Sequence, residues 1–183
     1  MAKRIQNPAK KRLSKRQRAR RRNWLIFGAL VIIVVVGVGV ALASLTRDQL
    51  GQKIPDLGNN HLSAAPTSYL WNSRPPTSGP HASEIAQWGE HAESVPEWYQ
   101  VHNLEDAGVI MHYNCPEGCP EIVAELRDIL TEMGSNQLIL QPYTNMDSRI
   151  AVTAWTRLLT LDKMDRGAIV DFIKAYRGID HHR

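Results

Sequence analysis

Three absences narrow what this 183-residue sequence can be. Positions 1–22 contain no acidic residue, and the stretch from Trp24 to Leu45 contains no charged residue. The chain also has no glycine-rich phosphate loop, no Gly-x-Ser-x-Gly and no His-Glu-x-x-His. These missing motifs are the common signatures of P-loop nucleotide-binding proteins, α/β-hydrolases and zinc proteases, so the sequence does not indicate any of these classes.

The first two absences predict a membrane segment. Eleven Lys or Arg residues lie within positions 1–22, directly before the 22 uncharged residues from Trp24 to Leu45. A helix of that length covers about 33 Å, enough to cross a hydrocarbon layer of about 30 Å. A buried core helix would show a polar face, which this stretch lacks. We therefore predict an uncleaved, single-pass signal anchor. A cleaved signal peptide, with Ala41–Ala43 as its cleavage site, is the alternative.

The basic flank also predicts the orientation of this segment, with the N-terminus in the cytoplasm and the C-terminal domain extracytoplasmic at the cell membrane. Eighteen acidic residues and eleven basic residues follow the helix, a net charge of −7. This acidic surface argues against nucleic acid as a partner and leaves the lipid bilayer and another envelope protein. The predicted parts are a basic cytoplasmic tail (1–23), a transmembrane helix (24–45), a stalk (46–53) and an extracytoplasmic domain (54–183).

The outer domain divides into an irregular half and a regular half. Residues 54–100 combine many turn residues with five Trp or Tyr, which predicts ordered loops around a short helix at 83–89. After them, apolar periodicity indicates a β-α-β-β-α core of the α+β or α/β class. The expected elements are strands at 107–114, 137–143 and 149–161 and helices at 120–134 and 165–178.

The two cysteines, Cys115 and Cys119, stand between the first of these strands and the helix after it. In an oxidising compartment such a pair usually forms a disulfide. Pro120 favours the first helical position, which would put Cys119 at a helix N-terminus, where a thiolate is stabilised for thiol redox or metal binding. Met111 and His112 lie just upstream, and sulfur and imidazole together suit copper or zinc. The motif resembles the copper site of the Sco copper chaperones, which implies a thioredoxin-like fold.

A second group of candidate metal ligands is spread along the chain. His61 and His81 each end a turn-rich phrase, and His102 precedes the first predicted strand. We predict that these three rings turn toward one pocket, with Glu105 or Asp106 beside them and His112 able to join. The alternative is a set of four unrelated histidines that lie on the surface or are simply hydrogen-bonded. His91, His181 and His182 are interpreted as plain surface residues.

Five phrases indicate a family: IPDLGNNHL, PPTSGPH, HNLEDAGVIMHYN, AVTAWTRLL and FIKAYRG. In this order they resemble DUF3105, a family of bacterial membrane-anchored domains of unknown function. The resemblance runs from about Ile54 to Gly178 and implies no activity. The family usually has a histidine where this chain has Asp106, which implies a site of mixed histidine and carboxylate ligands. It also usually has Trp-Gly where this chain has Trp155 and Thr156.

Together these observations predict a membrane-anchored extracytoplasmic protein that binds a transition metal, copper first, or acts in thiol redox. The alternative is a non-catalytic cell-envelope interaction domain in which the cysteines form a structural disulfide. A hydrolase with His102 as base and Glu105 as its orienting group is a third reading, but no nucleophile accompanies them. Whether the protein is an enzyme stays open at this point, with no catalytic residue assigned.

Overall fold

A computed structural model describes residues 15–47, 50–64 and 69–182. The chain divides into two compact units, Met1–Asp48 and Gln49–Arg183. The first fourteen residues of the predicted basic tail and residues 48 and 49 of the predicted stalk lie outside the described ranges.

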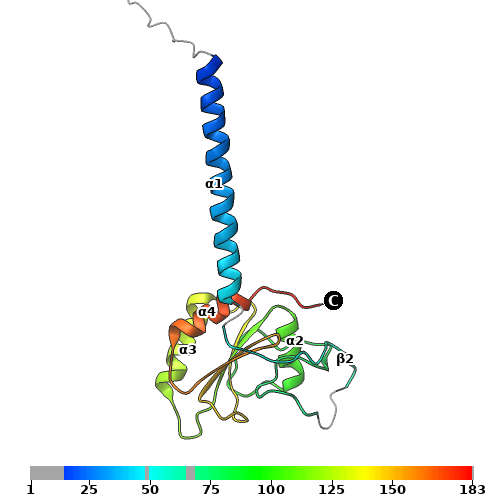
Figure 1. The fold of residues 1–183 in the computed structure, drawn as a ribbon. Coiled ribbons are helices and arrows are strands. Elements are labelled where there is room, and N and C mark those ends of the chain that lie inside the picture. The colour runs from blue at the N-terminus through cyan, green and yellow to red at the C-terminus, as the bar shows by residue number, and fades with distance from the viewer. Residues whose placement is uncertain (1–14, 48–49, 65–68, 183) are drawn as a thin grey trace, which may run out of the picture. The chain divides into compact units, whose positions relative to one another are not determined.

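The first unit contains one long helix, α1, from Lys15 to Arg47 (Figure 1). Its segment Arg20–Val40 is long enough and apolar enough to cross a membrane, and none of it is buried. A signal sequence near the N-terminus would have the same length and composition. The expectation of one apolar helix is therefore confirmed, at the level of a membrane anchor or a signal sequence.

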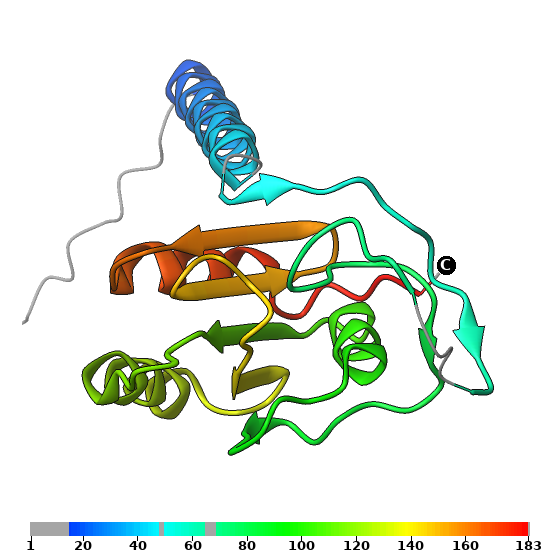
Figure 2. The same cartoon turned by 90° about the horizontal axis from the view of Figure 1, so that it is seen from below.

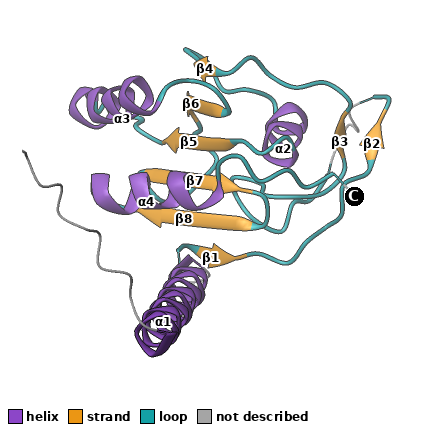
Figure 3. Ribbon diagram, turned by 90° about the horizontal axis from the view of Figure 1, so that it is seen from above, coloured by secondary structure: helices purple, strands orange, loops and turns teal. Residues whose placement is uncertain are grey.

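The second unit is built on a mixed six-stranded sheet (Figure 3). Its centre is β5 (Val109–Tyr113), which pairs in parallel with β6 (Leu138–Pro142) and antiparallel with β7 (Ile150–Ala154). The full strand order is β1-β8-β7-β5-β6-β4. The remaining strands are β8 (Arg157–Leu161) and the two edge strands, β1 (Gln52–Lys53) and β4 (Gly89–Glu90). With the four helices of the described residues, this confirms a mixed α+β protein.

One face of the sheet is covered by α3 (Pro120–Met133) and α4 (Arg166–Tyr176). Figures 2 and 3 view the sheet from opposite sides, and α4 lies in front of the strands only in Figure 3. Side chains alternate between the faces of a strand, so every second strand residue points toward these helices. Together they form the main core, which includes Val109, Met111, Leu138, Leu140, Ile150, Val152, Leu126, Ile129, Ile169 and Phe172.

The opposite face packs against α2, which runs from Glu97 to Glu105. Val101 and Leu104 of this helix contact Ile110 and Ile139 of the strands. Beyond α2, a separate two-stranded sheet pairs β2 (His61–Leu62) with β3 (His81–Ala82) in parallel. This second layer is the one that positions the histidines.

Three local expectations were wrong. The predicted third strand is a hairpin of β7 and β8, because Ala154 pairs with Arg157 around a two-residue turn and Thr156 has a positive φ of 57°. Residues 83–89 form bends and extended chain instead of a short helix. Helix α2 was not predicted, since Gln100, His102, Asn103 and Glu105 give it no continuous apolar stripe.

Candidate histidine and carboxylate site

Helix α2 supplies two of the site's side chains. His102 and Glu105 are three residues apart near its C-terminal end, so they share one face of the helix. Both are buried, and the Glu105 side chain is fully inaccessible to solvent. A carboxylate at such a depth requires compensating partners.

The small sheet supplies the next two side chains. β2 and β3 pair so that His61 stands opposite His81, and the His81 amide donates to the Asn60 carbonyl over 2.9 Å. Opposed residues of paired strands direct their side chains to the same face. Segments twenty residues apart in sequence therefore present their imidazoles together, with ring centroids 4.6 Å apart.

Two of the rings converge on a single carboxylate oxygen, and the third lies beside them. The Nε2 atoms of His61 and His81 lie 3.0 Å and 2.9 Å from Glu105 Oε2. The His102 ring lies 4.9 Å and 5.0 Å, between centroids, from those of His61 and His81. One ligand atom from each of these four residues lies within 4.8 Å of all the others. We call His61, His81, His102 and Glu105 the inner cluster.

Backbone carbonyls fix the orientation of two rings. His81 Nδ1 donates to the Gly79 carbonyl and His102 Nδ1 donates to the Ala82 carbonyl, each over 2.7 Å. In both residues the other ring nitrogen, Nε2, is not used by a backbone carbonyl and is directed toward the cluster. This is the arrangement in which proteins hold metal-binding histidines. Glu105 is held as well, because its Oε1 accepts from the Asn59 amide over 2.8 Å.

The electrostatics of the cluster favour an ionised carboxylate beside a neutral His81. Burial alone would raise the pKa of Glu105, but the Asn59 amide and the facing histidines outweigh it, so its pKa lies below the usual value. Burial lowers the pKa of His81, and the Gly79 carbonyl and Glu105 only partly offset this effect. A buried carboxylate anion beside a neutral imidazole attracts a cation.

A fourth ring, which the sequence did not indicate, approaches from the segment after α4. His182 Nε2 lies 3.5 Å from Glu105 Oε2 and 3.4 Å from Asp106 Oδ1. Its Nδ1 donates to Asp180 over 2.7 Å, and the pKa of His182 is raised mainly by that hydrogen bond. His182 is exposed, as interpreted, but it is not a plain surface residue, because its ring faces Glu105 and Asp106. Only the repeated histidine after the last helix could have drawn attention to it.

His112 and Met111 do not join the cluster. Met111 is fully buried in the apolar core against α3 and α4. His112 faces the other way, where the Gln141 amide donates to its Nδ1 over 3.1 Å and its Nε2 lies 2.9 Å from the Thr153 hydroxyl. Burial lowers the pKa of His112 to about 3. Because both ring nitrogens already have partners, this neutral histidine offers no lone pair to a metal.

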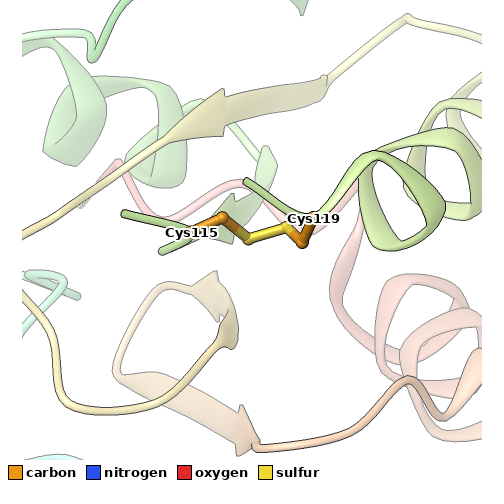
Figure 4. Close-up of a disulfide and its surroundings, with 2 residues drawn as sticks. All are labelled: Cys115 and Cys119. Carbon is orange, nitrogen blue, oxygen red and sulfur yellow. A yellow bond between two sulfur atoms is a disulfide. The ribbon is translucent and has the colours of Figure 1, made fainter. Parts of the chain in front are cut away.

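The cysteines form a disulfide between Cys115 and Cys119, whose Cα atoms are 5.7 Å apart (Figure 4). Cys119 is the N-cap of α3, directly before Pro120. The pair follows the C-terminal end of β5, while Glu105 precedes its N-terminal end. Five strand residues at about 3.3 Å each put about 17 Å between the two places. The cysteines and the inner cluster therefore cannot bind one metal ion together.

The fold and these side chains define a mixed α+β domain with a histidine and carboxylate cluster beside its sheet. The family model described as "Protein of unknown function (DUF3105)" matches residues 63–182, and the chain belongs to this family. This match confirms the family resemblance and contains His81, His102, Glu105 and His182. No curated protein matches the chain, and no solved structure does.

Proposed function

We propose that this domain binds a divalent transition metal ion, Cu²⁺ or Zn²⁺, through the inner cluster of His61, His81, His102 and Glu105. One observation carries the proposal. Both nitrogens of His81 face oxygen atoms, the Gly79 carbonyl on one side and the Glu105 carboxylate on the other. A neutral imidazole has one N–H and cannot donate to both.

A positively charged His81, with a proton on each ring nitrogen, would satisfy both contacts. Its side chain is fully buried, however, and burial lowers its pKa. A cation held between Nε2 and Glu105 Oε2 removes the conflict, because both atoms then act as electron-pair donors. Nitrogen and oxygen ligands lie about 2.0–2.2 Å from zinc and hence about 3.3 Å apart in a tetrahedron. The contacts of 2.9 Å and 3.0 Å around Glu105 are close to that spacing.

The donor set bears on the identity of the metal. Three imidazoles and a carboxylate suit Cu²⁺ and Zn²⁺, whereas Cu⁺ prefers thiolate and thioether ligands. The disulfide and the buried Met111 leave the inner cluster without sulfur. The proposal is therefore a divalent ion, and the analogy with the Sco copper chaperones is not carried into it.

The proposed setting is a membrane-anchored, single-pass protein with this domain outside the cytoplasm. The support is the apolar segment Arg20–Val40 and the eleven basic residues within positions 1–22. The disulfide agrees with an oxidising compartment. Reporter enzymes fused after Arg183 test the orientation: a fusion active only in the cytoplasm would overturn it.

Metal titration of the full-length chain in mild detergent tests the proposal. We expect one Cu²⁺ or Zn²⁺ per chain after removal of other ions with a chelator, measured by competition with an indicator dye and by elemental analysis. His81→Ala and Glu105→Gln should each weaken affinity about 100-fold or more, since even residues that only orient metal ligands are worth about 10–100-fold. His91→Ala is the matched control, because His91 bonds to the Gln87 carbonyl outside the cluster and should leave affinity unchanged.

Two other results would overturn the proposal. Failure of the parent chain to bind either ion would remove the metal site and favour an envelope interaction domain with a structural disulfide. Loss of binding on replacing Cys115 and Cys119 with Ser, with no loss in His81→Ala, would move the site to the start of α3.

Thiol redox remains a second candidate function on one observation. The disulfide lies in the β5-α3-β6 crossover, which joins two parallel strands, at the N-terminus of the connecting helix. A cysteine pair beside a βαβ unit is typical of thioredoxin-like redox motifs, although three residues separate this pair instead of two. Exchange with a small dithiol, followed by mass spectrometry of the alkylated cysteines, tests it. A disulfide inert to dithiols under native conditions would exclude this role.

A further inference from the structure

A second group of potential ligands overlaps the inner cluster at His102 and includes two partly exposed side chains. It consists of His102, Asp106 and His182, each with one ligand atom within 4.8 Å of the other two. Asp106 Oδ1 lies 3.6 Å from His102 Nε2 and 3.4 Å from His182 Nε2. We call these three residues the outer cluster.

The segment that carries His182 is held in place by backbone and ring contacts. Gly178 donates its amide to the Ala107 carbonyl over 2.8 Å, and His181 donates its amide to the Glu105 carbonyl over 3.0 Å. The His181 ring stacks on Trp155, with centroids 5.8 Å apart and planes at 20°. Asp180 then orients His182 through Nδ1, which directs Nε2 toward Asp106 and Glu105. These contacts therefore hold His182 in a defined position beside the other residues of the outer cluster.

The two clusters differ in exposure. The side chains of His182 and Asp106 are 44% and 31% exposed, that of His102 is 9% exposed, and those of His81 and Glu105 are fully buried. His61 is the exposed member of the inner cluster, with 40% of its side chain open to solvent. His102 belongs to both clusters and has only Nε2 to offer, because Nδ1 donates to the Ala82 carbonyl. One nitrogen lone pair binds one ion at a time. An ion bound to His102 in one cluster therefore excludes a second ion bound to His102 in the other cluster.

We propose that the outer cluster is a loading position, which takes a metal ion from solvent and passes it through His102 to the inner cluster. This inference depends on the proposed function. A hydrated ion would exchange some of its water for Asp106 and His182 while it is still exposed. It would then exchange these two ligands for Glu105, His81 and His61 as it moves inward. His102 would stay bound throughout, so no step requires the loss of every ligand.

Such a position predicts a kinetic signature. A transient site on the path changes the rates of loading and release together, and it leaves the equilibrium affinity nearly unchanged. For Zn²⁺ and the full-length chain in detergent, His182→Ala and Asp106→Asn should each slow both rates about tenfold, equivalent to about 1.4 kcal/mol of barrier. The dissociation constant should change less than about threefold, under 0.7 kcal/mol.

Stopped-flow mixing with a zinc indicator gives the loading rate, and transfer to excess EDTA gives the release rate. His91→Ala is the control for removing a histidine outside both clusters, and circular dichroism checks that each variant is folded. Unchanged rates in both variants would overturn the loading position while leaving the inner site intact. A tenfold loss of affinity with unchanged loading would also overturn it, since His182 would then be an ordinary ligand of one larger site. A parent chain that binds no Zn²⁺ or Cu²⁺ would remove the inner site and this inference together.

Discussion

The two faces of the six-stranded sheet bury different kinds of side chain. On the face covered by α3 and α4, the buried cluster consists of apolar side chains and Cys119 of the disulfide. The face covered by α2 also buries the polar groups His112, Gln141 and Thr153 on its strands and Asn103 and Glu105 on α2. Burying polar groups costs free energy unless each is hydrogen-bonded. The first face is therefore an apolar core, whereas the second combines a smaller apolar cluster with the candidate site.

The polar face contains two different arrangements of buried histidines. His112 has a partner on each ring nitrogen, and Gln141 is in turn fixed because its Oε1 accepts the Val95 amide over 2.6 Å. That network is complete without a ligand. At the inner cluster, by contrast, several nitrogens face one carboxylate oxygen. A histidine count alone does not distinguish a structural network from a binding site, but the partners of each ring nitrogen do.

The largest expected effect comes from damaging the apolar face alone. Leu126 of α3 is fully buried in the main core. Leu126→Ala should lower the free energy of unfolding by about 2–5 kcal/mol, the usual cost of such a cavity. Urea unfolding followed by tryptophan fluorescence measures it. Because the inner cluster lies on the other face, metal affinity of the folded variant should stay at the parent value. A fall in affinity would show that the two faces are coupled.

A smaller effect is expected from the disulfide. Cys115 and Cys119 are four residues apart, and a loop so short restricts the unfolded chain little. Replacing both with Ser should lower the free energy of unfolding by about 2 kcal/mol in the chain-entropy account. Urea unfolding with and without a reductant provides the comparison, since a reductant should destabilise only the parent. Destabilisation of the serine variant by reductant would contradict this.

The smallest effect is a pH dependence on the polar face. The pKa of His112 is about 3 in the folded chain and about 6.5 when exposed. Between these values the unfolded chain binds a proton that the folded chain excludes, so stability falls as the pH falls. At about pH 5.5 the loss attributable to His112 should be about 1.4 kcal/mol relative to pH 8.

Chelator-treated protein should be compared with His112→Gln, which keeps a polar side chain but cannot titrate. The difference between the two urea-unfolding curves across this pH range isolates His112 from the other histidines. Parallel pH profiles of the parent and the variant would show that His112 is protonated without cost.

Periodicity predicted the regular half of the fold well. Ile122, Leu126 and Ile129 mark the buried stripe of α3, and the strand around Ile110 is bounded by glycine and the proline turn. Helix α2 was not predicted because four of its six buried residues are polar. Its burial therefore follows from tertiary contacts and not from an apolar periodicity in the sequence. The β7–β8 turn escaped because Trp155 and Thr156 are not the residues typical of a two-residue hairpin.

The candidate site was only partly accessible to sequence reasoning. Turn-rich phrases drew attention to His61 and His81, which β2 and β3 bring into register. Apart from the repeated histidine after the last helix, no local pattern indicates His182, because backbone hydrogen bonds from Gly178 and His181 bring it to the cluster. The closeness of the two clusters is likewise a product of tertiary packing.

The segment Gly79–Ala82 provides His81 and also both carbonyls that orient His81 and His102. A carbonyl is the same chemical group in every residue, so a change of side chain at position 82 leaves this acceptor in place. Position 79 is different, because Gly79 has φ +125° and an added Cβ would lie 2.9 Å from the Trp71 ring. A change of side chain at position 82 should therefore keep the acceptor of His102 in place, whereas a side chain at position 79 would displace the acceptor of His81.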